Sequence, residues 1–143
     1  EKREKVLPFI RAWAESARGL SGETVFLGFS RIQDFAQAAD RATRDYDYLL
    51  TPTAPMTAFP AEMASPSGDP LNPFPHIGFT VAFNMSGQPA LSINSGFDHA
   101  GLPIGLQIVG RRFDDLGVLA LARAYEDLRS AALRPWPEPA ARA

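Results

Sequence analysis

The sequence predicts an α/β fold in which a small β-sheet is covered by helices on its faces. Short apolar segments bounded by glycine or proline, at 46–51, 90–94 and 105–109, are typical of strands. Before and after these segments, apolar residues recur every three to four positions, which is the spacing of amphipathic helices. A chain of 143 residues with 45% hydrophobic side chains can bury one core, so we expect a single domain segment.

The composition argues against several classes of protein. The formal net charge is −2 with basic and acidic residues intermixed, whereas nucleic-acid and membrane-surface proteins carry clustered positive charge. No apolar run approaches the ~20 residues that span a bilayer, and no signal-peptide pattern opens the chain. The absence of cysteine is compatible with a cytoplasmic protein. The first residue is Glu1 rather than methionine, so we expect a piece of a longer chain.

Two helices are expected in the first 45 residues. The first is predicted over 1–20; Pro8 lies inside it, so the helix either begins near residue 7 or is kinked. The second is predicted over 23–45, in one piece or two. Ser30 and Gln33 form a candidate capping box for it, because the serine oxygen and the glutamine side chain can satisfy each other's backbone amides.

The strand over 46–51 is followed by a proline-rich loop over 52–76. This loop holds seven of the chain's thirteen prolines, which prevent a helix or a central strand from running through it. Such long loops are functional or mobile. We predict a surface excursion and favour a variable insertion over a cap or partner-contact loop.

The segment 77–110 is the motif-bearing region and is predicted to hold two strands. Residues 77–86 have partly helical spacing and lead to Gly87. The strands at 90–94 and 105–109 are joined by a polar connection, so they form a hairpin or two neighbours in one sheet.

The chain closes with a helix over 114–132 and a tail over 133–143. Asp114 or Asp115 is the expected N-cap of this helix. Its inner face is predicted to consist of Val118, Leu121, Ala122, Tyr125 and Leu128.

Several sequence blocks resemble the C-terminal part of amidase signature enzymes. The blocks are D-x-L-L-T-P-T at 47–53, N-x-x-G-x-P-A at 84–90, G-L-P-x-G-L-Q-x-x-G at 101–110 and L-A-x-x-x-E at 121–126. They occur in the family's order over roughly 30–128. One departure is Asn94-Ser95-Gly96, where the family commonly has a proline two residues before the glycine, so we expect this strand to end differently.

The resemblance implies a mixed β-sheet flanked by helices, whose remaining strands belong to an N-terminal half outside this chain. It also implies hydrolysis or transfer of acyl groups from amides by a serine nucleophile, a second serine with a cis peptide bond, and a lysine base. A serine hydroxyl needs such a base because it is a weak nucleophile by itself. In the family these residues precede the region matched here, and the only lysines of this chain are Lys2 and Lys5. No catalytic residue is therefore expected in this chain, and the chain alone is predicted to be inactive.

Other active sites find little support in the sequence. The pattern G-x-S-x-G does not occur. His76 and His99 are each on a predicted loop without a second ligand at metal spacing, so we predict no metal site and no cofactor. Asp47 is interpreted as a strand-end residue that faces solvent or bonds to nearby backbone. Asp98 is interpreted as a solvated loop residue, with contact to a polar substrate as the alternative.

Substrate-binding residues are implied by the resemblance for the segment leading into N-x-x-G-x-P-A, which runs beside the acyl-binding cleft in amidases. These residues are Thr80, Phe83, Asn84 and Gly87. The alternative is structural: Phe83 belongs to the core, Asn84 satisfies backbone groups and Gly87 permits a turn.

The resulting hypothesis is a fold-completing and pocket-lining part of an amidase. Its partners would be the N-terminal half and a small amide substrate, with a homo-oligomer left open and no nucleic acid or membrane. The alternative is a binding or scaffold module that uses the same fold without chemistry. In either case an isolated segment would expose sheet edges and apolar surface.

Overall fold

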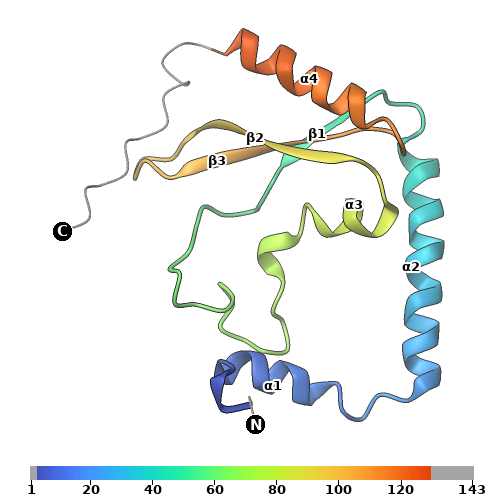
Figure 1. Ribbon diagram of the computed structural model, residues 1–143, viewed down its shortest axis with the longest axis vertical. Helices are drawn as coiled ribbons and strands as arrows, with labels where there is room; N and C mark the ends of the chain where they lie inside the picture. The colour runs from blue at the N-terminus through green and yellow to red at the C-terminus, as the bar shows by residue number, and fades with distance from the viewer. Residues whose placement is uncertain (1–2, 130–143) are drawn as a thin grey trace.

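The computed structural model describes residues 3–129, and the tail predicted over 133–143 lies outside them (Figure 1). The fold is mixed α/β, with a small sheet and helices, as predicted. Its elements are η1 (Arg3–Lys5), α1 (Pro8–Ser16), α2 (Gly22–Thr43), β1 (Leu49–Pro52), η2 (Pro75–Ile77), α3 (Val81–Ser86), β2 (Ala90–Phe97), β3 (Pro103–Val109) and α4 (Asp115–Leu128).

The three strands form an antiparallel sheet in the order β1-β3-β2. β2 and β3 form the expected hairpin, and β1 joins from an earlier part of the chain, with Leu50 opposite Ile108. β2 runs three residues beyond the predicted end at 94, through a register shift between Asn94 and Gly96. There the Asn94 side chain accepts a hydrogen bond from the Gly96 amide at 2.8 Å. The side chain therefore shapes the exit of this strand.

One face of the sheet is apolar and is covered by α4 (Figure 1). Ile108 of β3 and Ile93 of β2 pack against Val118 and Ala122 of the helix, and all four side chains are buried. The packing is close, since a Cβ added to Gly110 would lie 2.7 Å from Val118. α4, β2 and β3 therefore share one small core.

The opposite face carries polar side chains and looks toward α3 and the proline-rich segment (Figure 1). Gln107 is only 3% exposed, and its amide nitrogen donates to the Thr51 hydroxyl at 2.9 Å and to the Phe79 carbonyl at 3.0 Å. Gln88, after α3, donates to the Thr43 hydroxyl and to the Gly110 carbonyl, both at 3.2 Å. The bonds of Gln107 join the sheet to the segment before α3, and those of Gln88 join the end of α2 to the end of β3. Both side chains are buried, and buried polar groups of this kind need hydrogen-bond partners within the protein.

The two helices near the N-terminus begin close to the predicted positions, but the cap of the second one differs from the prediction. α1 begins at Pro8, where a helix tolerates proline, so the alternative of a start near residue 7 is confirmed; the helix ends at Ser16 rather than at residue 20. α2 is one continuous helix whose N-cap is Ser21, which accepts from the Thr24 amide at 3.1 Å. The predicted capping role of Ser30 is wrong: this residue lies inside α2, and its hydroxyl donates to the Phe26 carbonyl one turn earlier.

α4 has the predicted cap and most of the predicted inner face. The Asp114 carboxylate accepts from the Gly117 amide at 3.1 Å, and Leu121 and Tyr125 join the buried core residues. The sequence pattern also predicts Leu128 on this face, but its side chain is 86% exposed because it lies in the last turn, outside the core cluster. Residues 130–132 of the predicted helix lie outside the described part of the chain.

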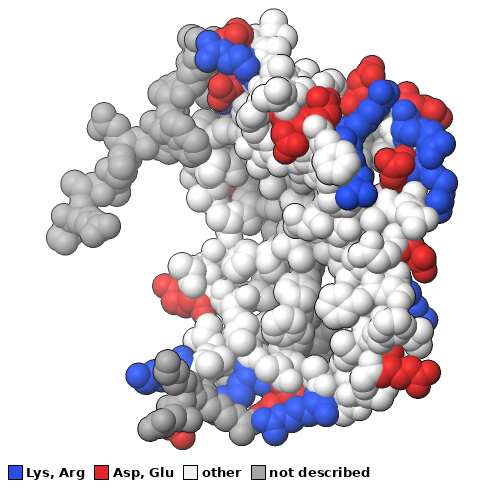
Figure 2. All heavy atoms as spheres, turned by 45° about the vertical axis from the view of Figure 1, so that its right-hand side comes forward, with Lys and Arg blue, Asp and Glu red and all other residues white. Residues whose placement is uncertain are grey.

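α2 exposes several large apolar side chains. Figure 2 shows charged side chains at the upper and lower ends and along the right edge of this view, with a broad uncharged region between them. α2 alone exposes two phenylalanines extensively, Phe26 at 70% and Phe29 at 67%. Apolar surface of this kind is typical of a face that packs against more protein.

Candidate functional site

A cavity of about 630 Å³ lies between the beginning of the proline-rich segment and the parts of β2 and β3 that are near their connecting turn. This volume is in the range of small-molecule sites. Its wall is built from two parts of the chain that are distant in sequence. The lining residues are Thr53, Ala54, Pro55, Met56, Thr57, Ala58, Phe59, His76, Ser92, Asn94, Pro103, Ile104 and Gly105.

A pair of hydroxyl groups stands on the sheet side of this cavity. The Oγ1 of Thr53, just after β1, lies 2.7 Å from the Oγ of Ser92 on β2. The two hydroxyls meet across β3 because Gly105 has no side chain there: an added Cβ would lie 2.6 Å from the Thr53 oxygen and 2.9 Å from the Ser92 oxygen. The Thr53 amide also donates to the Gly105 carbonyl at 2.9 Å, which holds the threonine over the glycine.

His76 lies on the loop side of the cavity, at η2. Its ring packs edge-on against Phe59, with the ring centroids 5.5 Å apart. The Nδ1 atom of His76 is buried and has no hydrogen-bond partner among the described residues. Proline-rich residues around it are held by side chains as well, since buried Ser65 donates to the Pro73 carbonyl at 2.8 Å. The segment 52–76 is therefore irregular but internally bonded, and its residues 53–59 and 76 line the cavity.

The four substrate-binding residues proposed from the resemblance lie together on and beside α3, but none of them lines this cavity. Thr80 precedes the helix, and its hydroxyl donates to the Ile77 carbonyl at 3.2 Å. Phe83 is half-buried and Asn84 is exposed. Gly87 adopts φ +69° and ends α3, a conformation that favours glycine. Their role in substrate binding stays a prediction.

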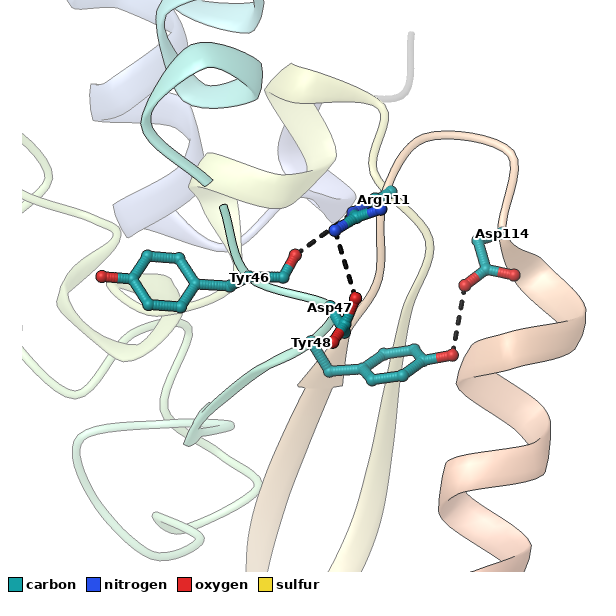
Figure 3. A network of polar contacts seen from close by, with 5 residues as sticks. All are labelled: Tyr46, Asp47, Tyr48, Arg111 and Asp114. Carbon is teal, nitrogen blue, oxygen red and sulfur yellow. Dashed lines mark hydrogen bonds and ion pairs between the residues drawn. The ribbon is translucent and has the colours of Figure 1, made fainter. Parts of the chain in front are cut away.

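A second polar cluster joins the start of β1 to both ends of the β3–α4 connection (Figure 3). Arg111 donates to the Tyr46 carbonyl at 3.2 Å and forms an ion pair with Asp47 at 3.1 Å. The Tyr48 hydroxyl donates to the cap residue Asp114 at 3.2 Å. Desolvation and the neighbouring Asp114 carboxylate raise the pKa of Tyr48. Asp47 is solvent-facing as predicted, but it precedes the strand and bonds to an arginine side chain, so this cluster is structural.

Asp98 organises the tip of the β2–β3 hairpin. Its carboxylate accepts from the Ala100 amide at 2.8 Å and from the Leu102 amide at 2.9 Å. These backbone bonds hold the pKa of Asp98 below its ordinary value, although desolvation acts in the opposite direction. The carboxylate is therefore used in the turn, as expected of a local Asx motif.

Residues 3–129 offer neither a metal centre nor a membrane span. Among these residues no group of three or more histidine, aspartate or glutamate side chains could hold a metal ion. His99 lies on the exposed tip of the hairpin. None of the described helices is both long and apolar enough to cross a membrane.

Comparison with known proteins identifies the family. The family model described as amidase matches residues 6–119, which is most of the chain. The chain belongs to the amidase family. Among curated relatives, a glutamyl-tRNA(Gln) amidotransferase subunit of Thermodesulfovibrio yellowstonii is 44% identical over 87 residues, which are 61% of this chain and 18% of that protein. The corresponding subunit of Pseudothermotoga lettingae is 48% identical over 87 residues, which are again 61% of this chain and 18% of that protein.

Solved structures show the same fold. The same glutamyl-tRNA(Gln) amidotransferase subunit from Thermotoga maritima superposes with a TM-score of 0.66 and 26% identity, covering 94% of this chain and 37% of that chain. A bacterial aryl acylamidase of the amidase signature family superposes with a TM-score of 0.72 and 25% identity, covering 95% of this chain and 28% of that chain. The chain thus spans about a fifth of the curated relatives and about a third of the solved structures, and its fold is part of the amidase signature fold.

Proposed function

We propose that this chain is the C-terminal, fold-completing and pocket-lining part of an amidase that hydrolyses carboxylic amide C–N bonds in the cytoplasm. The observation that carries the proposal is the family match over 6–119, together with the small share of the relatives that the chain spans. The catalytic serines and lysine would be supplied from outside this chain, because its only lysines, Lys2 and Lys5, lie before the matched region.

The chemistry explains why this chain would be inactive alone. Amide hydrolysis by a serine requires a base that takes the hydroxyl proton and donors that stabilise the developing oxyanion. Thr53 and Ser92 have hydroxyls close together in the cavity, but no lysine or histidine base is paired with either of them in the contacts of the described residues. Their geometry suits binding rather than nucleophilic attack.

The partner in this proposal is the N-terminal part of the same amidase fold. The exposed apolar side chains of α2, above all Phe26 and Phe29, support a contact with additional protein. Aromatic side chains at the centre of an interface contribute most of its binding energy, so these two residues are the first to test.

The experiment mixes the purified chain with the preceding segment of its parent protein and measures hydrolysis of a panel of aryl amides. We expect activity only in the mixture. The double variant Phe26→Asp/Phe29→Asp should reduce complex formation at least tenfold, since it places two charges in an apolar contact. The matched control is Phe113→Asp, which changes an exposed phenylalanine outside α2.

Two outcomes would contradict the proposal. Amide turnover by the purified chain alone would show that catalytic residues are present within it. A stable complex without turnover, in which the chain binds small amides or proteins, would favour the scaffold module instead.

A further inference from the structure

Residues 54–58 form a short strap along one side of the cavity. All of them line the cavity, and the opposite side is formed by residues of the β2–β3 hairpin. The strap lies between two fixed points. At its start the Thr53 amide donates to the Gly105 carbonyl at 2.9 Å. At its end Phe59 packs against His76, with the ring centroids 5.5 Å apart.

The strap itself has few bonds to the rest of the molecule. Among the hydrogen bonds of the described residues, no backbone bond joins 54–58 to another segment. Pro55 has no amide hydrogen to donate, and Met56 is 40% exposed. Segments with so few backbone bonds open locally at a low cost in free energy, whereas core strands stay closed. The position of the strap therefore depends on its side chains.

One side chain of the strap reaches the tip of the hairpin, where the Thr57 hydroxyl donates to the Asp98 carboxylate. That carboxylate is itself held in place, because it accepts from the Ala100 amide at 2.8 Å and from the Leu102 amide at 2.9 Å. An ionised carboxylate has about four lone-pair sites, so the two amides leave room for the threonine. The Leu102 and Ala100 amides hold the pKa of Asp98 below its ordinary value, so the carboxylate is ionised at neutral pH and is a strong acceptor.

We propose that the bond between Thr57 and Asp98 is a latch that holds the strap against the hairpin tip and thereby sets the width of the cavity. When the latch is broken, residues 54–58 bulge outward between their fixed ends, and the strap moves away from Ile104 on the opposite side. Asp98 acts on the cavity only through Thr57, so it is a positioning residue. The inference concerns a movement of the chain and does not depend on amidase activity.

The test uses nitroxide labels on the full 143-residue chain, which has no cysteine, so that one introduced cysteine gives one labelled site. Met56→Cys places the label on the strap, next to Thr57. Loop motions take nanoseconds to microseconds, and the electron paramagnetic resonance spectrum of the label distinguishes a restrained strap from a mobile one. Thr57→Val keeps the side-chain shape but removes the hydroxyl, and it should raise the ratio of mobile to restrained strap about threefold. Thr57→Ser keeps the hydroxyl and should retain the wild-type spectrum.

Two controls separate the latch from general loosening of the chain. Thr80→Val removes a hydroxyl that donates to the Ile77 carbonyl outside the strap, and it should leave the label at residue 56 unchanged. A label at Leu71→Cys, which lies in the same proline-rich segment and is 77% exposed, should not respond to Thr57→Val. The Asp69 carboxylate holds that part of the segment by accepting from the Leu71 amide at 2.8 Å.

The carboxylate is tested in the same way. Asp98→Asn removes the charge and weakens the latch, so it should loosen the strap of the wild type but add little to Thr57→Val. Asp69→Asn is the matched control, because the Asp69 carboxylate accepts from an amide within its own turn and lies outside the latch.

A second label reports the width of the cavity. Ile104→Cys lies on the side opposite the strap, and labels at residues 56 and 104 together give a dipolar broadening that falls as they separate. Thr57→Val should reduce this broadening, whereas Thr80→Val should not. Circular dichroism verifies the fold of each variant.

Higher mobility at residue 56 and weaker broadening in Thr57→Val, but not in Thr57→Ser, would support the latch. An unchanged spectrum in Thr57→Val, or a Thr57→Ser spectrum equal to that of Thr57→Val, would overturn it. Equal loosening at residue 71 would also overturn it, since the hydroxyl would then support the whole proline-rich segment rather than the strap. None of these readouts requires amide turnover, so they are independent of the outcome of the amidase assay.

Discussion

The two faces of the three-stranded sheet are stabilised in different ways. The face under α4 is closed by apolar packing between Ile93, Ile108 and the helix residues Val118 and Ala122. The opposite face is held by the hydrogen bonds of Gln107 and ends in an open cavity with hydroxyl groups on its wall. Hydrophobic packing tolerates no water-filled space, whereas a polar face remains stable beside a cavity if its buried groups are bonded. The comparison therefore associates the α4 face with a closed apolar core and the opposite face with a hydrogen-bonded wall beside an open cavity.

The largest expected effect on this comparison comes from the α4 face. Ile108→Ala should lower the free energy of unfolding by about 2–5 kcal/mol, because the side chain is 1% exposed and its removal leaves a cavity against α4. Ile104→Ala is the matched control on the same strand: this side chain is 41% exposed and should have a much smaller effect. Urea unfolding followed by circular dichroism measures both. Equal effects would mean that α4 is not packed on Ile108.

The next effect concerns the polar face. Gln107→Leu should lower the free energy of unfolding by about 1–3 kcal/mol, since it leaves the Phe79 carbonyl without its donor. Thr51→Val removes only one acceptor of the same amide and should have an effect below about 1 kcal/mol. Urea unfolding ranks the two variants. A neutral Gln107→Leu would show that the bond from the sheet to the segment before α3 does not contribute to stability.

The sequence is sufficient to predict the elements of the α4 face. Apolar residues at a spacing of three and four identify Val118 and Ala122, and glycine or proline bounds the strands. Leu128 shows the limit of the pattern: the period continues into the last turn of α4, but the core cluster does not include it. At α2, Ser30 and Gln33 match the capping-box pattern, but Ser30 lies inside one continuous helix and Ser21 is the cap.

The cavity could not be predicted from local patterns. Thr53 and Ser92 are 39 residues apart and meet only because β1 pairs with β3 rather than with β2. Strand order is a long-range property that neither residue's neighbours indicate. The signal that was available is Gly105: a glycine inside a strand indicates close approach of other groups, and here those groups are the two hydroxyls.

The smallest expected effect is a change in stability at alkaline pH, and it concerns Tyr48, whose hydroxyl bonds to the cap of α4. The pKa of Tyr48 is raised above its ordinary value of 10.0 by desolvation and by Asp114, so the folded chain favours the neutral phenol. This contribution to stability is complete below about pH 10 and is lost as the pH rises through the folded-state pKa. The unfolding free energy of the wild type should therefore fall more steeply in this range than that of Tyr48→Phe, which has no phenol proton to lose.

The control is Tyr46→Phe. The ring of Tyr46 is exposed and only its backbone carbonyl takes part in the cluster, so this variant should keep the wild-type profile. Parallel alkaline profiles for wild type and Tyr48→Phe would show that the bond from β1 to α4 makes no difference to folding, and the α4 face would then depend on its apolar core alone.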